Sequence, residues 1–408
     1  MRDPSRLRGI TWDHPRGIDA LRAAGAEFER GTGVAIEWTV RSLREFEETP
    51  VAELAGEYDL VALDHPFIGD AVDAGALMPL DPVFSADELC ERDEDSAGPS
   101  HASYRWQGRQ WGGAVDAACM VGAHRAGAVD RAEIPARWDD VSAFVRRHGR
   151  EAVLLAANPT HLWGTVLSLC EAEANTAVGP RDRWRRGADG RPEWWGDAGV
   201  DPALLGEAVE RARRLLTLCD PASLGADPIA VLERIADSRA LYCPLVFGYV
   251  TYARPGARDA LVAFTDAPRL GDDPVGTLTG GVGLAVSSRP APAPGPDPDA
   301  GGNAGRDAAA FVRLATSART QGGVAHDAGG QSGRRSVWRD GRVNDEVTGF
   351  YRDTLATMDR SFLRPRLPGY PAYQRAAAET LHRGLVNGER GHDLVTELGN
   401  LWRKHVRV

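Results

Sequence analysis

The first 80 residues alternate between segments with the pattern of a β-strand and segments with the pattern of a helix. Residues 7–12, 34–38 and 58–63 are predicted strands, and the third is a nearly continuous apolar run, which is typical of a strand covered on both faces. The residues between them have the apolar spacing of helices. Because strand and helix alternate, we predict right-handed crossovers and a parallel sheet with helices packed against it.

The same three residues, Asp-His-Pro, follow the first and the third predicted strands. Asp13 and His14 come after the first strand, and Asp64 and His65 come after the third. In open parallel sheets, ligands bind beyond the carboxyl ends of the strands. We therefore predict that both triplets lie at one edge of the sheet and line the opening of a ligand site.

The chemistry of these triplets leaves several readings open. A carboxylate beside an imidazole can fix the histidine tautomer for acid–base catalysis, with His14 or His65 oriented by Asp13 or Asp64. The same side chains can simply contact a ligand, or they can end the strands and cap a neighbouring carbonyl. Two histidines and two aspartates can also hold zinc or iron, but no His-x-x-x-His or comparable close spacing is present, and no metal site is predicted.

Asp116 lies in an apolar segment, residues 113–118, that is also a predicted strand. A buried carboxylate there needs a partner, which would be Arg16 or a ligand hydroxyl or ammonium group. A salt bridge with a structural role explains the same residue equally well.

Several aromatic residues are candidates for the flat walls of a site for a sugar ring or another planar ligand, although single aromatic side chains are often plain core. These candidates are Trp12, Trp111, Tyr242, Tyr249 and Tyr252. Residues 181–199 combine tryptophans with arginines, as in nucleic-acid-binding segments, but acidic residues lie among them. We expect a solvated surface loop there.

Composition excludes several classes of protein. Lys404 is the only lysine, so a Schiff-base lysine, a pyridoxal-phosphate anchor and a Gly-Lys-Ser/Thr phosphate loop are excluded. The formal net charge of −10 argues against a nucleic-acid-binding protein. The five cysteines lack the C-x-x-C spacing of a zinc or redox site, and we predict neither a metal nor any other cofactor.

The N-terminus runs directly into the first strand, without the basic region, apolar stretch and cleavage site of a secretory signal. If Met1 is the native start, we expect a cytoplasmic protein, and an extracytoplasmic one if the sequence is truncated. No apolar run approaches the roughly 18 residues of a membrane span, so we predict no membrane insertion.

Six short segments spread along the chain carry a further pattern: residues 26–34, 58–61, 74–81, 111–118, 241–252 and 280–286. Together they resemble the extracellular solute-binding proteins of ABC transporters, the maltose-binding-protein-like group with the periplasmic-binding-protein type 2 fold. Two features differ from typical members of the group: no secretory signal is recognised, and two histidines lie at the expected ligand site. The chain therefore looks like a signal-less branch of the group. A transporter partner is therefore not expected unless the protein is exported.

The resemblance implies an α/β fold of two lobes, each a mixed sheet flanked by helices, joined by crossing hinge strands that close on a ligand. Lobe 1 would comprise residues 1–115 and 265–320, and lobe 2 residues 116–264 and 321–408. The implied ligand contacts in the interlobe cleft are Trp12, Asp13, His14, Arg16, Asp64, His65, Asp116, Tyr242, Tyr249, Tyr252 and Gly280.

Three functions remain open on these grounds. The first is a solute-binding protein that holds a small polar molecule in the cleft without altering it. The second is a cytoplasmic enzyme on the same scaffold, with His14, His65 and Asp64 performing proton abstraction, a lyase step or a cyclase step on a small carbonyl compound. The third is a ligand sensor that reports closure to another protein.

Overall fold

The computed structural model describes residues 6–177, 186–187, 189–237, 240–288 and 302–407. These residues form two compact units. The first unit comprises residues 1–117, 281–343 and 365–368, and the second comprises residues 118–280, 344–364 and 369–408. The predicted lobe boundaries at 115, 264 and 320 stay a prediction.

Two long strands pass from one unit into the other. Strand β7 (Gly113–Arg125) leaves the first unit after Ala117, and β12 (Thr279–Ser287) enters it at Gly281. The chain thus has the two strand connections that the predicted fold class requires.

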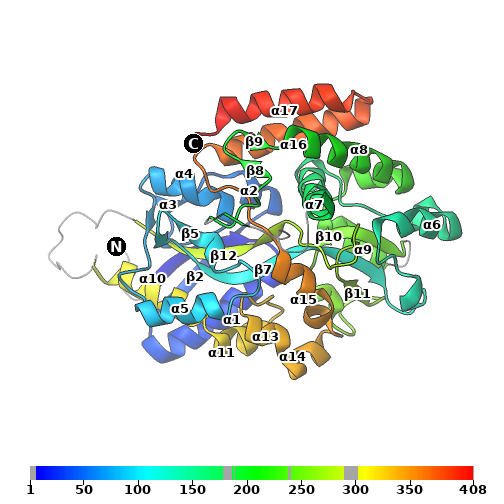
Figure 1. The fold of residues 1–408 in the computed structure, drawn as a ribbon. Helices are drawn as coiled ribbons and strands as arrows, with labels where there is room; N and C mark the ends of the chain where they lie inside the picture. Colours follow the sequence, from blue (N-terminus) through cyan, green and yellow to red (C-terminus); the bar gives the residue numbers. More distant parts are fainter. Residues whose placement is uncertain (1–5, 178–185, 188, 238–239, 289–301, 408) are drawn as a thin grey trace. The chain divides into compact units, whose positions relative to one another are not determined.

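The first unit contains the parallel sheet predicted from the sequence. Strand β1 (Arg6–Trp12) lies between β2 (Ala35–Arg41) and β3 (Leu60–Leu63) and runs parallel to both. Helix α1 (Pro15–Thr32) connects β1 to β2, as the apolar spacing indicated (Figure 1). Strand β12 pairs with β3 in the antiparallel direction, which makes this sheet mixed.

Helices and short connecting elements cover both faces of this sheet. Phe28 of α1 packs edge-on against Phe311 of a later helix, so two segments far apart in the sequence share one core. The other elements of the first unit are α2 (Leu43–Glu48), α3 (Val51–Ala55), η1 (His65–Phe67), α4 (Ile68–Asp73), β4 (Leu77–Met78), α5 (Ala86–Glu94), η2 (Ala102–Tyr104), β5 (Arg105–Trp106), β6 (Arg109–Gln110), α10 (Gly302–Ala315), α11 (Ala318–Gly322), α12 (Val324–Asp327) and α13 (Arg335–Arg339).

The second unit has a smaller antiparallel sheet in which β10 (Tyr242–Phe247) and β11 (Val262–Thr265) both pair with β7. Helices α7 (Pro159–Ala177), α8 (Pro202–Leu218), α16 (Tyr370–Asn387) and α17 (Gly391–His405) pack against one another in this unit (Figure 1). Its other elements are η3 (Arg131–Glu133), α6 (Trp138–His148), η4 (Arg150–Ala152), β8 (Trp195–Gly196), β9 (Gly199–Val200), η5 (Pro221–Gly225), α9 (Pro228–Ala236), η6 (Val250–Ala253) and α15 (Phe350–Arg360). Helix α14 (Gly341–Glu346) spans the boundary between the units.

The expectation of a solvated loop at residues 181–199 is wrong for Trp195, which is 2% exposed. Its ring lies 5.8 Å from Tyr370 and 6.4 Å from Trp402, between ring centroids. Trp194 stacks on it at 5.6 Å. The partners come from α16 and α17, about 200 residues later, so no local pattern could reveal this burial. Trp184 and residues 181–183 and 185 lie outside the described residues.

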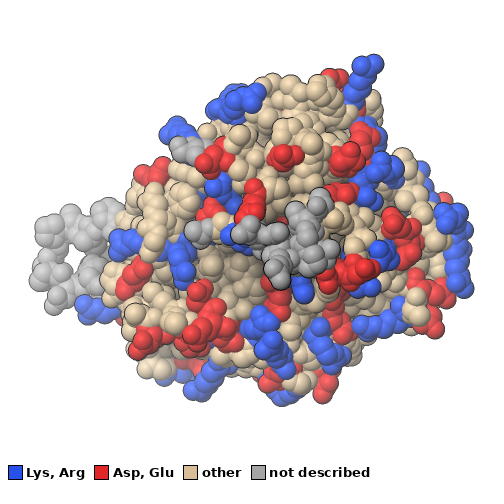
Figure 2. Space-filling model, in the orientation of Figure 1, with Lys and Arg blue, Asp and Glu red and all other residues tan. Residues whose placement is uncertain are grey.

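On the face drawn in Figure 2, basic and acidic side chains are interspersed over the described residues. Nucleic-acid-binding proteins present a continuous basic surface, and that face does not have one. Within the described part of the chain, no helix combines the length and the apolar character needed to cross a membrane.

Candidate functional site

The two Asp-His-Pro triplets lie at the same edge of the first unit's sheet, as predicted. Strands β1 and β3 are parallel neighbours, with Gly9 paired to Leu60 and Ile10 paired to Val61. The same register continued brings the ends of both strands level, with one triplet directly after each. We call this the carboxyl edge: the residues that follow β1, β2 and β3.

At the end of β3, the Asp64 carboxylate holds the His65 side chain. Asp64 Oδ1 accepts a hydrogen bond from the His65 backbone N–H at 2.8 Å and lies 3.1 Å from His65 Nδ1. Asp64 is thus the N-cap of the short helix η1. Pro66 suits the first turn of this helix because proline has no backbone N–H that would need an acceptor there. The His65 ring is only 1% exposed.

At the end of β1, His14 has a different role. It is the N-cap of α1, and its Nδ1 accepts a hydrogen bond from the Arg16 backbone N–H at 3.1 Å. Asp13 is exposed, and its carboxylate makes no contact with His14 that resembles the contact between Asp64 and His65. The two triplets therefore share a sequence but not a hydrogen-bond pattern.

Arg16 and Asp116 form the buried ion pair that the sequence suggested. Arg16 Nε donates to Asp116 Oδ2 at 2.6 Å and Nη2 donates to Oδ1 at 2.5 Å, a two-point contact between the start of α1 and β7. Their side chains are 5% and 4% exposed. Burial raises the pKa of Asp116, and the neighbouring guanidinium of Arg16 opposes that rise.

Trp12 is the last residue of β1, directly before the carboxyl edge. Its ring lies 5.5 Å from Phe46, between centroids, and its Nε1 is buried with no hydrogen-bond partner among the described residues. A cavity of about 10 Å³ lies between Trp12, Arg16 and Asp116. That volume is at the lower limit for holding one water molecule.

Gly17 is the residue that allows Trp12 to lie against α1. A Cβ atom at position 17 would lie 2.6 Å from the Trp12 ring, whereas one at Gly25 in the same helix would meet nothing nearer than 3.7 Å. We expect Gly17→Ala to lower the free energy of unfolding by about 1–3 kcal/mol through overpacking. The matched Gly25→Ala variant should raise it by up to about 1 kcal/mol, because alanine favours helices. Urea unfolding measures both, and equal effects of the two variants would contradict the proposed packing of Trp12.

Sequence reasoning missed Arg41, the last residue of β2 at the same edge. It is 8% exposed, and its Nη2 donates to the Ala62 carbonyl at 3.0 Å and its Nη1 to the Glu45 carbonyl at 3.3 Å. The guanidinium lies over the Phe46 ring at 5.2 Å. Burial lowers the pKa of Arg41 to about 10. The predicted second strand, residues 34–38, ends three residues before Arg41, whereas the observed strand includes it.

Trp111, the second aromatic candidate in sequence order, belongs to the core of the first unit. It is 8% exposed, and its Nε1 donates to the Trp106 carbonyl at 3.0 Å. The structure thus gives Trp111 a packing role, and its contact with a ligand stays a prediction.

The remaining candidates belong to the second unit. The Tyr242 hydroxyl donates to the Pro135 carbonyl at 3.3 Å, and the Tyr252 hydroxyl donates to Glu233 at 2.8 Å. Tyr249 is 5% exposed, with its ring 6.4 Å from that of Tyr252. A Cβ atom at Gly280 would lie 2.7 Å from the Phe247 ring, so glycine is required for that approach. Each of these residues is anchored within its own unit, and a ligand role stays a prediction.

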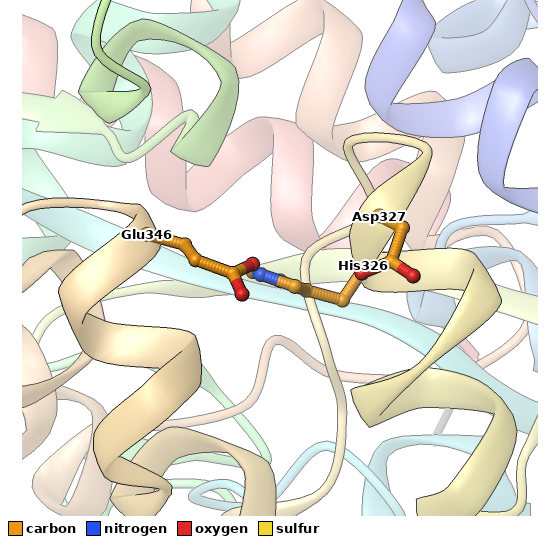
Figure 3. Close-up of side chains that lie close together, drawn as sticks. All are labelled: His326, Asp327 and Glu346. Atoms are coloured by element: carbon orange, nitrogen blue, oxygen red, sulfur yellow. The ribbon is translucent and has the colours of Figure 1, made fainter.

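Figure 3 shows a group of possible metal ligands, His326, Asp327 and Glu346. His326 and Asp327 are neighbours on α12 in the first unit, whereas Glu346 is the last residue of α14 and belongs to the second unit. A metal site needs its ligands on one rigid support. We therefore derive no metal site from this group.

The chain is similar in structure to solved solute-binding proteins. The maltose-bound MalE3 of T. maritima has a TM-score of 0.75 and 14% identity, over 98% of this chain and 99% of that one. A solute-binding protein of Agrobacterium radiobacter K84 in complex with ribitol has a TM-score of 0.73 and 18% identity. One of Thermotoga lettingae TMO bound with α-D-tagatose has a TM-score of 0.74 and 13% identity. Both also align over 98% of this chain and 99% of theirs.

Comparisons of sequence alone give no further relative: no family profile matches, and no curated protein matches. The fold is nevertheless matched over nearly the whole length, including both units and the two connecting strands. The chain therefore has the two-lobe α/β fold of the ABC-transporter solute-binding proteins.

Proposed function

We propose that this chain binds a small polar molecule without altering it, and that the carboxyl edge of the first unit forms part of the binding site. The observation that carries the proposal is that His14 and His65 follow the neighbouring parallel strands β1 and β3, and that the buried Arg16–Asp116 pair lies next to His14. In α/β sheets this edge is where ligands bind. The similar structures contain maltose, ribitol and α-D-tagatose, so small hydroxyl-bearing compounds are the first to test.

Native mass spectrometry of the purified protein should detect a small molecule bound as isolated. Thermal unfolding with added maltose, ribitol or α-D-tagatose should show a raised Tm, because a ligand of the folded state stabilises it. His14→Ala and His65→Ala should each weaken binding at least about tenfold, or about 1.4 kcal/mol. The control is His392→Ala, which replaces an exposed histidine on α17. This variant should bind the same ligand with unchanged affinity. A protein that carries no molecule and responds to none of the three compounds would contradict the proposal.

The contact between Asp64 and His65 favours one second candidate, an enzyme in which His65 removes a proton next to a carbonyl group. A histidine with a carboxylate on Nδ1 is oriented for such a step. Solvent deuterium incorporation into small ketones, followed by NMR, tests this function. An enzyme would exchange the proton and lose the exchange in His65→Ala, whereas a binding protein would show no exchange above the buffer rate.

A further inference from the structure

The parallel sheet of the first unit ends at strand β2, residues 35–41, which pairs with β1 on one side. The pairing with β1 is regular along all seven residues, without a shift of register. Glu37, Thr39 and Val40 are exposed, as expected for a strand at the edge of a sheet. Among the described residues, no strand pairs with the outer side of β2.

One hydrogen bond shows which backbone groups of β2 face outward. The Asp13 backbone N–H donates to the Arg41 carbonyl at 2.7 Å, so the backbone groups of Arg41 point toward β1. In a strand, the backbone N–H and C=O groups of successive residues point to opposite sides. Those of Ile36, Trp38 and Val40 therefore point to the outer edge. Within the described part of the chain, these groups have no hydrogen-bond partner.

An open edge of this kind is a template on which another strand can pair. Proteins usually block such an edge with proline, a bulge or charged side chains. Strand β2 has no proline and no bulge, and its Arg41 guanidinium turns inward to the carbonyls of Ala62 and Glu45. Glu37 is then the only charged side chain of β2 that is exposed. The strand thus lacks most of the usual protection against pairing.

We propose that the outer edge of β2 binds β2 of a second copy of this chain, antiparallel and with Trp38 on the twofold axis. This register places Ile36 opposite Val40 of the second copy, so apolar side chains meet along one face. On the other face, Glu37 lies opposite Thr39. Centring the pair on Glu37 would oppose two carboxylates, which is destabilising, and centring it on Thr39 would leave Ile36 beyond the end of the second strand.

The dimer should be weak. Standard interfaces bury about 800 Å² per partner, more than the open edge of one seven-residue strand offers. We therefore expect a dissociation constant on the order of 100 μM. Sedimentation velocity of the full chain measures it, with monomers at low micromolar concentration and mostly dimers near 1 mM, roughly ten times that constant. A chain that stays monomeric over this range would overturn the proposal.

Val40→Lys and Val40→Pro test the edge in two ways. Lysine places a charge opposite Ile36, whereas proline removes the outward N–H of residue 40 and leaves the bonds to β1 intact. Each variant should dimerise at least about tenfold more weakly. Val386→Lys is the matched control, because Val40 and Val386 are the exposed large apolar residues of the described chain, at 37% and 52%. If all three variants dimerised alike, the edge would not be the interface.

Cysteine cross-linking tests the register. Glu37→Cys and Thr39→Cys are made separately in a Cys90→Ser background, which lacks the exposed native thiol, and are exposed to oxidised glutathione alone and as a mixture. A disulfide requires Cβ atoms about 4 Å apart, and the proposed register sets positions 37 and 39 directly opposite each other. The mixture should give a disulfide-linked dimer, whereas each variant alone should not. A mixture that cross-links no better than the single variants would overturn the register.

Discussion

Asp116→Ala is expected to lower the free energy of unfolding of the protein by about 3–5 kcal/mol. The substitution removes the carboxylate that pairs with Arg16 at 2.5 and 2.6 Å, and it leaves a guanidinium that is 95% buried without that charge. Burying a cation away from water is costly unless a carboxylate compensates it. Urea unfolding followed by tryptophan fluorescence measures the loss.

Two further variants separate this effect from a general loss of charge. Glu37→Ala removes an exposed ion pair with Arg6 in the same unit, where the side chains are 56% and 63% exposed. It should cost less than about 1 kcal/mol, because solvent screens surface pairs. The double variant Arg16→Met with Asp116→Leu should recover most of the stability, because apolar pairs replace buried ion pairs well. A loss below about 1 kcal/mol in Asp116→Ala would contradict the buried pair.

Glu171→Ala is expected to have a comparable effect in the second unit, about 3–5 kcal/mol. The fully buried Glu171 carboxylate accepts from Arg186 Nη2 and Trp194 Nε1, each at 2.7 Å, and from Asn175 Nδ2 at 2.8 Å. Removing it leaves one buried donor, from Asn175, and two partly buried donors, from Arg186 and Trp194, without this acceptor. Because Trp194 stacks on Trp195, its fluorescence should change together with the unfolding midpoint.

The controls for Glu171 use a conservative change and an exposed residue. Glu171→Gln keeps the shape and one acceptor oxygen, so it should lose less stability than Glu171→Ala. Glu207→Ala, at an exposed position on α8, should change the free energy of unfolding by no more than about 0.5 kcal/mol. If Glu171→Ala behaved like Glu207→Ala, the carboxylate would not hold this segment in place.

Local sequence patterns determined the strands of the first unit and the placement of the two triplets. The order of strand and helix, with Leu60–Leu63 as a continuous apolar run, indicated parallel neighbours covered on both faces. Once β1 and β3 are neighbours, the residues after Trp12 and Leu63 must meet at one edge. Periodicity and strand order depend on neighbouring residues in the chain, which is why they can be read without a structure.

Only the tertiary structure decided which atoms these side chains contact. His14 and His65 have the same neighbours in sequence, yet one accepts from the N-terminus of α1 and the other lies against a carboxylate, because a long helix follows the first triplet and a short turn follows the second. The burial of Trp195 depends on helices about 200 residues away. Hydrogen-bond direction and burial are properties of atoms brought together across the chain, and local sequence patterns do not encode them.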